Sequence, residues 1–101
     1  MYRILILLFI TKFGFSQNRI SGEVSDGQTN ETLIGANIII EDENNGTSTN
    51  INGKFSLSTN KKFPLDIIIS YLGYENKIIT IKDNKSLKIK LFPNTKKLNE
   101  V

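Results

Sequence analysis

The sequence predicts an all-β fold in which six or seven short strands pack as a two-layered sandwich. Three observations favour this class. β-Branched residues dominate the apolar set, with 16 isoleucines in 101 residues, and such side chains suit a pleated, half-buried surface. Alanine occurs once, at Ala36, and no apolar stripe recurs at helical spacing. Turn-forming residues divide the chain at short intervals, which favours a sandwich over βαβ units.

The N-terminal segment is predicted to be a signal peptide comprising residues 1–16. Residues 1–3 supply a positive start, residues 4–10 form an apolar run, and small residues precede a cleavage site expected between Ser16 and Gln17. The run is too short to cross a bilayer, which takes about 20 apolar residues. The alternative is a buried N-terminal strand, which would need cover on both faces. We therefore expect an exported protein.

Seven segments after the leader are predicted to be strands: residues 19–26, 37–41, 47–49, 54–57, 64–71, 77–82 and 87–91. In the first strand, Ile20 and Val24 share one face at a period of two residues. The second is a run of isoleucines that ends in a charged turn, and the third is short and polar. Because Asn52-Gly53 is the strongest kind of short hairpin signal, the third and fourth strands are expected to pair as a hairpin.

The last three strands follow from the same alternation. Pro64 begins the fifth strand, where its missing N–H costs least. Ile68 faces away from Ile67 and Ile69, which predicts a central strand that is covered on both faces. The sixth strand is rich in isoleucine. The seventh alternates most regularly between apolar residues and lysines, so it is expected to have one buried and one exposed face.

Four segments, taken in order, resemble the carboxypeptidase regulatory-like domain. Residues 22–26 and 33–38 are similar to its G-x-V-x-D and L-P-G-A-N-V opening, residues 46–55 to G-T-x-T-D-x-x-G-x-F, and residues 69–75 to V-S-Y-x-G-Y-E. Leu98 to Val101 is similar to the L-D-E-V that leads into the TonB box and plug of many Bacteroidetes outer-membrane proteins. The motif residues that carry over are Gly22, Gly35, Ala36, Gly46, Thr47, Gly53, Phe55, Tyr71, Gly73 and Tyr74.

The resemblance implies a seven-stranded transthyretin-like, or immunoglobulin-like, sandwich. Such domains are found at the N-terminus of TonB-dependent receptors, including those of the SusC type, and face the periplasm. We accordingly expect residues 17–92 to form the sandwich and residues 93–101 a flexible tail. Ile34 departs from the usual Pro of the family motif, and Asn50 and Asn99 depart from the usual Asp.

The function implied by the resemblance is a non-catalytic accessory or interaction domain of a TonB-dependent receptor, in the periplasm or at the outer membrane. Its partner would be the receptor plug and barrel or another envelope protein. The chain stops where a plug would begin, so it is expected to be either a truncated or fragmentary receptor or a domain that works alone. The alternative function is a free-standing exported module that binds glycan or an envelope protein.

Several motif residues also have a structural interpretation. Gly35 beside Ala36 is expected to let backbones approach closely, and Gly53 to supply a positive φ in the hairpin. Gly73 permits a bulge or a tight corner. Tyr71 and Tyr74 have the chemistry to stack on a sugar, but Tyr71 is expected in the core and Tyr74 at the surface or as a corner anchor.

The composition argues against catalysis. The chain contains no histidine and no cysteine, which excludes Ser-His-Asp triads, histidine acid–base chemistry, thiolate metal sites, disulfides and a lipidated cysteine. Residues 41–44 offer oxygen ligands that suit Ca²⁺, but the EF-hand spacing fails. No phosphate-binding glycine loop is present. We therefore expect no enzyme activity, no cofactor and no metal.

Charge sets further limits on partners. The formal net charge of +3 falls to +1 when Arg3 and Lys12 leave with the predicted leader, so nucleic-acid or anionic-membrane binding is not expected. No transmembrane segment is expected in the mature chain. Lysines cluster near the last strand, and they indicate either a basic patch for a partner or protection of a sheet edge; edge protection is the favoured interpretation. The lysines are Lys82, Lys85, Lys88 and Lys90.

Overall fold

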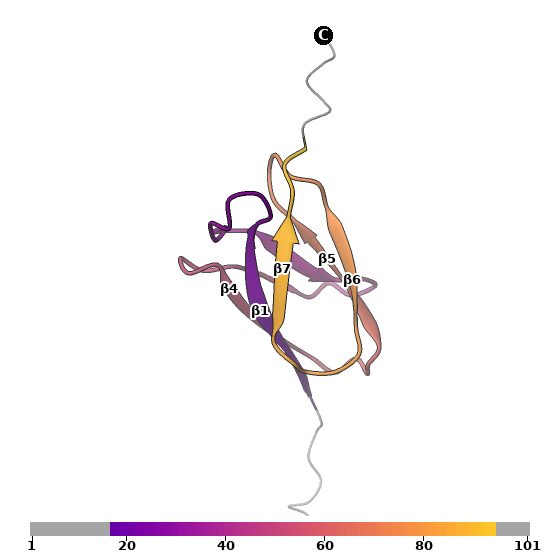
Figure 1. Ribbon diagram of the computed structural model, residues 1–101. Helices are drawn as coiled ribbons and strands as arrows, with labels where there is room; N and C mark the ends of the chain where they lie inside the picture. The colour runs from indigo at the N-terminus through magenta and orange to yellow at the C-terminus, as the bar shows by residue number, and fades with distance from the viewer. Residues whose placement is uncertain (1–16, 95–101) are drawn as a thin grey trace, which may run out of the picture.

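The computed structural model describes residues 17–94, which form seven strands in two sheets that pack face to face (Figure 1). The strands are β1 (Asn18–Asp26), β2 (Asn37–Ile40), β3 (Gly46–Ser48), β4 (Lys54–Thr59), β5 (Leu65–Ser70), β6 (Lys77–Ile81) and β7 (Leu87–Leu91). The predicted all-β sandwich is confirmed. The predicted signal peptide, including Ser16, and the Leu98 to Val101 motif lie outside the described residues. Within 17–94 no helix has the length and apolarity to cross a membrane.

The two sheets contain three and four strands. The first sheet has the order β4-β1-β7, with β1 antiparallel to β4 and parallel to β7. The second has the order β3-β2-β5-β6, and all of its pairs are antiparallel. β5 is therefore central within its sheet, as predicted, and β3, β4, β6 and β7 are edge strands.

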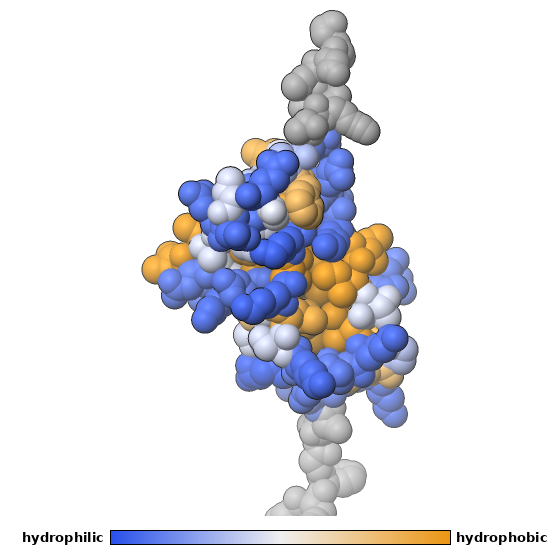
Figure 2. Space-filling model, in the orientation of Figure 1, coloured by the Kyte–Doolittle hydropathy of each residue, from blue (hydrophilic) through white to orange (hydrophobic). Residues whose placement is uncertain are grey.

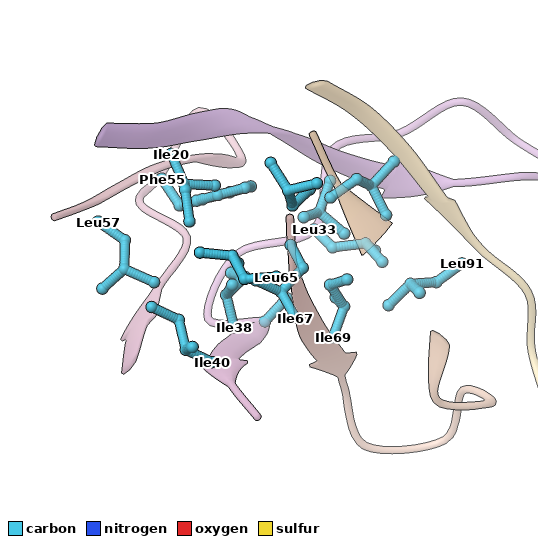
Figure 3. Packing of buried hydrophobic residues seen from close by; sticks show 14 residues of the cluster. Ile20, Leu33, Ile38, Ile40, Phe55, Leu57, Leu65, Ile67, Ile69 and Leu91 are labelled. Atoms are coloured by element: carbon cyan, nitrogen blue, oxygen red, sulfur yellow. The ribbon is translucent and has the colours of Figure 1, made fainter. Parts of the chain in front are cut away.

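The core lies between the two sheets and consists of aliphatic side chains and one phenylalanine (Figure 3). Every second side chain of β4 and β5 is buried, while the residues between them are exposed in β4 and half-buried in β5. The largest side chains with almost no solvent exposure come from both sheets. They are Ile20, Val24, Ile38, Ile40, Ile67, Ile69 and Leu91.

The predicted hairpin between the third and fourth strands is wrong, because β3 and β4 belong to different sheets. The turn at residues 50–53 instead carries the chain from one layer to the other. The Val24 N–H donates to the Gly53 carbonyl at 2.8 Å, so the turn pairs with β1 rather than closing onto β3. Gly53 has a φ of +75°, which is the conformation that the Asn-Gly signal predicts. The Asn-Gly signal thus identifies the turn, but it does not show whether the strands before and after the turn pair with each other.

The prediction that β5 is covered on both faces is also wrong. Ile68 is only half-buried, and in register with it lie Ile39, which is 43% exposed, and Ile78, which is 62% exposed. This isoleucine row crosses the outer face of the second sheet. The sandwich has two layers, so each sheet buries one face; cross-strand contacts between β-branched residues still favour isoleucine on the other.

Gly35 has a role different from the expected close approach of backbones. A methyl group built at Gly35 would have no atom within 4 Å, but its φ is +86°. An L-residue with a side chain rarely adopts this conformation. The glycine is therefore required by the bend that leads into β2.

Candidate functional site

The most elaborate polar and aromatic arrangement lies where β7 leaves the sandwich (Figure 1). Three segments meet there: the end of β1, the turn between β5 and β6, and the chain that follows β7. We name this region the exit corner. It comprises residues 26–27, 71–75 and 92–94.

Backbone hydrogen bonds fix the course of the departing chain. The Gly27 N–H donates to the Leu91 carbonyl at 2.8 Å and extends the contact between β1 and β7. The Glu75 N–H then donates to Phe92 O at 2.9 Å, and the Asn94 N–H donates to Gly73 O at 2.8 Å. The chain therefore crosses from the first sheet to the β5–β6 turn. The described structure continues two residues beyond the domain end expected at residue 92.

Asp26 is the polar centre of the exit corner. It is 6% exposed, and its Oδ1 accepts the backbone N–H groups of Gln28 at 2.6 Å and Thr29 at 3.0 Å. Its Oδ2 accepts the Tyr74 hydroxyl at 2.6 Å. The Tyr74 hydrogen bond, together with the two N–H donors, lowers the pKa of the Asp26 carboxyl below its ordinary 3.8. The same bond raises the pKa of Tyr74 above its ordinary 10.0.

Aromatic rings surround this bond. The Tyr71 and Tyr74 rings lie 5.4 Å apart at an angle of 57°, within the range of favourable tilted pairs. Phe92 packs against Gly27, where a methyl group would collide with the phenylalanine ring. Leu72, at the tip of the β5–β6 turn, is 95% exposed. The exit corner thus combines a hydrogen-bonded carboxylate, a pair of tyrosine rings and a highly exposed leucine.

The predicted motif residues separate into three groups. Gly22, Ala36 and Phe55 are buried within the sandwich, and a methyl group on Gly22 would lie 2.7 Å from the Leu87 carbonyl oxygen. The second group lies in turns and on an edge strand, namely Gly35, Gly53, Gly46 and Thr47. Only Tyr71, Gly73 and Tyr74 lie at the exit corner. Gln17, the expected first residue after cleavage, is exposed just before β1.

Sequence reasoning missed two residues of this site. Asp26 is the last residue of the first family segment, and Phe92 stands before a proline at the expected tail. The aspartate followed by Gly27 is a recognisable signal for a side chain that binds backbone N–H groups two and three residues later. Phe92 has no comparable local signal, because its contacts are with distant segments.

The acidic turn after β2 has structural partners. Glu43 accepts the Thr59 hydroxyl at 3.2 Å and the Asn45 side-chain amide at 3.4 Å. Among residues 17–94, no three acidic side chains gather in the way that a bound metal ion requires. The turn therefore contributes to the contact between β2 and β4 in this part of the chain.

Of the four lysines near β7, Lys88 and Lys90 lie on this edge strand, and Lys82 and Lys85 lie in the loop that precedes it. Apolar surface is visible where β6 and β7, the edges of the two sheets, face each other (Figure 2). A groove of about 200 Å³ there is lined by residues of both strands. The Lys77 Nζ donates to the Lys90 carbonyl at 3.2 Å, and Lys90 Nζ donates to the Asn30 side chain at 2.9 Å. Lys77 lies outside the cluster of four lysines, so protection of the edge by that cluster stays a prediction.

Replacing Tyr74 with phenylalanine is expected to lower the melting temperature, because Asp26 loses its side-chain donor while the ring remains. Thermal unfolding followed by circular dichroism measures the change. Tyr71→Phe is the matched control, since it removes a hydroxyl from the neighbouring ring but leaves the bond to Asp26 intact. Equal melting temperatures for the two variants would contradict a locking role for Tyr74.

The Asp26 carboxylate is expected to make stability depend on acid pH. Its pKa is lowered in the folded chain, so the unfolded state takes up a proton first as the pH falls. The stabilisation is therefore present above the ordinary carboxyl pKa and is lost as the pH falls through the lowered folded value. Denaturation of the wild type and of Asp26→Asn at several pH values measures the difference between their free energies of unfolding. This difference should shrink below about pH 4. A difference that stays constant to pH 2 would be evidence against this effect.

Comparisons with known proteins place these features in context. Residues 20–101 match the family model of the CarboxypepD_reg-like domain. The chain is 32% identical over 86 residues to TonB-dependent receptor P39 of Formosa agariphila and 34% identical over 80 residues to TonB-dependent receptor SusC of Bacteroides thetaiotaomicron. These matches cover 85% and 74% of this chain but only 8% of each receptor.

Solved structures show the same fold at low sequence identity. A cohesin–X-dockerin complex of Acetivibrio cellulolyticus aligns with a TM-score of 0.63 at 16% identity, covering 75% of this chain and 58% of the other. The C-terminal domain of the shaft pilin SpaA of Lactobacillus rhamnosus GG aligns with a TM-score of 0.57 at 16% identity, covering 78% and 99%. At this identity the likeness concerns the sandwich alone.

Proposed function

The chain belongs to the CarboxypepD_reg-like domain family, and from this premise we propose that it is a non-catalytic accessory domain of a TonB-dependent outer-membrane receptor. The observation that carries the proposal is the pattern of similarity to receptors. Three TonB-dependent receptors match at 32% to 37% identity over 71% to 85% of this chain, and each match spans only 7% or 8% of the receptor. The chain thus corresponds to one small part of a large receptor.

The chemistry of the domain supports a non-catalytic role. The chain has no histidine and no cysteine, and the carboxylates with resolved partners serve the fold. Asp26 binds the Tyr74 hydroxyl and two backbone N–H groups, and Glu43 binds Thr59. The pKa of the Asp26 carboxyl is lowered by these hydrogen bonds, whereas a general acid near neutral pH needs a raised one.

The exit corner is where we place the contact with the rest of the receptor. The hydrogen bonds of Gly27, Glu75 and Asn94 direct the chain out of the sandwich along one path. Leu72 lies next to Gly73, which binds Asn94, and is more exposed than Phe92, the other exposed large apolar side chain of the exit corner. A rigid exit and an adjacent apolar contact would fix the orientation of the domain relative to the polypeptide that follows.

A periplasmic location completes the proposal, and cell fractionation tests it. The full chain, expressed in a Gram-negative host, is expected in the periplasmic or outer-membrane fraction. Mass spectrometry of the recovered protein should show an N-terminus at Gln17. Recovery of the intact chain from the cytoplasm would contradict the location, while leaving the family assignment unaffected.

A further inference from the structure

The arrangement of β1 and β7 has a mechanical consequence. The two strands are parallel neighbours, with a continuous register from Gly22 opposite Leu87 to Asp26 opposite Leu91. The chain enters β1 at one end of the sandwich and leaves β7 at the other (Figure 1). Tension between these two points therefore slides β7 along β1. All of the hydrogen bonds in the ladder carry the load together, rather than one pair at a time.

The neighbouring structure resists this sliding. β1 is the central strand and is held on its other side by six register pairs with β4. β7 also inserts Ile89 and Leu91, which are 2% and 1% exposed, into the core. Beyond β7, the exit corner adds the hydrogen bonds of Glu75 and Asn94. Displacement of β7 along its axis must break the ladder, withdraw two buried side chains and open the exit corner.

The pair formed by β1 and β4 is expected to resist tension less than the pair formed by β1 and β7. These strands are antiparallel, and Asn18 lies opposite Thr59 at the end where the chain enters the sandwich. Tension between residue 17 and the segment after β4 would separate this pair from its open end. The ladder would then break one pair at a time, which requires less force.

We propose that the domain is a tension-bearing anchor, which stays folded when the chain leaving β7 is pulled away from the sandwich. The property follows from the strand arrangement and does not depend on the assignment to a receptor. It gives the exit corner a second role, since the same hydrogen bonds that direct the chain also close the end of the loaded ladder.

Single-molecule pulling of the full chain tests the proposal. The absence of native cysteine allows DNA handles to be attached at chosen pairs of engineered cysteines. Gln17→Cys with Asn94→Cys loads the β1–β7 ladder lengthwise, and Gln17→Cys with Lys62→Cys separates β1 from β4. All three positions are exposed. We expect the first pair to need at least about twofold more force, because forced unfolding follows the unfolding barrier along the direction of pulling.

Two glycine variants supply a matched control. A methyl group at Gly22 would lie 2.7 Å from the Leu87 carbonyl oxygen on β7, and one at Gly46 would lie 2.8 Å from the Ile38 carbonyl oxygen in the other sheet. Gly22→Ala is expected to reduce the rupture force between residues 17 and 94, and Gly46→Ala to leave it unchanged.

The comparison of rupture forces in the two pulling directions, made without either glycine substitution, tests the proposed anchor even if a glycine variant fails to fold. Equal rupture forces in the two directions would overturn the proposal. So would a lower force between residues 17 and 94 than between 17 and 62. The proposed anchor requires a higher rupture force between residues 17 and 94 than between 17 and 62. It also requires that Gly22→Ala lower the force between 17 and 94 and that Gly46→Ala leave it unchanged.

Discussion

Replacing Ile67 with alanine is expected to lower the free energy of unfolding by about 2–5 kcal/mol. Ile67 is fully buried on the central strand β5, in register with Ile40 on one side and Ile79 on the other. The substitution removes three carbon atoms from the middle of the core, and neighbouring side chains fixed on two sheets collapse only partly into the space. For a domain of this size, the loss is a large fraction of the total stability.

Urea denaturation measures this effect as a shift of the midpoint at an unchanged slope. Ile51→Ala is the matched control, because Ile51 is 75% exposed in the turn between β3 and β4. Its substitution should change the free energy of unfolding by no more than about 0.5 kcal/mol. Similar losses for the two variants would mean that the core is not centred on β5.

Replacing Thr49 with valine is expected to lower the free energy of unfolding by about 2–6 kcal/mol, although the two side chains have nearly the same shape. Thr49 is 5% exposed. Its hydroxyl donates to the Leu33 carbonyl at 2.6 Å and accepts the Ala36 N–H at 2.8 Å. Valine would leave both backbone groups buried without these partners, and each unsatisfied group costs about 1–3 kcal/mol. The hydroxyl thus holds the bend before β2 against the segment that follows β3.

Thr49→Ser distinguishes the contribution of the hydroxyl from that of the methyl group, because serine keeps only the hydroxyl. Serine keeps the donor and the acceptor, so it should retain most of the stability that valine loses. Guanidinium denaturation of the three proteins gives the comparison. If Thr49→Val were as stable as the wild type, water or a shifted backbone would have to satisfy the Leu33 and Ala36 groups, and the described hydrogen bonds would not be important for folding.

The strands could be predicted from the sequence because their signal is local. The alternation of Leu87, Ile89 and Leu91 with lysines defines β7, and the same period defines β4. The assignment of strands to sheets could not be predicted in this way. Asn52-Gly53 indicates a turn, but whether that turn closes a hairpin or crosses between layers depends on its hydrogen bond with Val24, a residue far away in the sequence.

The exit corner was only partly predictable for the same reason. Tyr74 and Gly73 are evident from the family motif, whereas the partner of Tyr74, Asp26, is 48 residues away. No periodicity or turn signal links two positions at that separation. Phe92 is the last residue before the expected flexible tail, yet its carbonyl accepts the Glu75 N–H at the corner.

A chimaeric receptor tests the proposed function most directly. In SusC of Bacteroides thetaiotaomicron, the segment matched at 34% identity would be replaced by residues 20–94 of this chain, and SusC-dependent growth would be compared with that of a strain lacking the segment. If this chain is an accessory domain of such receptors, the chimaera should restore growth, and Asp26→Asn within it should weaken the restoration. A chimaera that grows no better than the deletion strain would contradict the assignment.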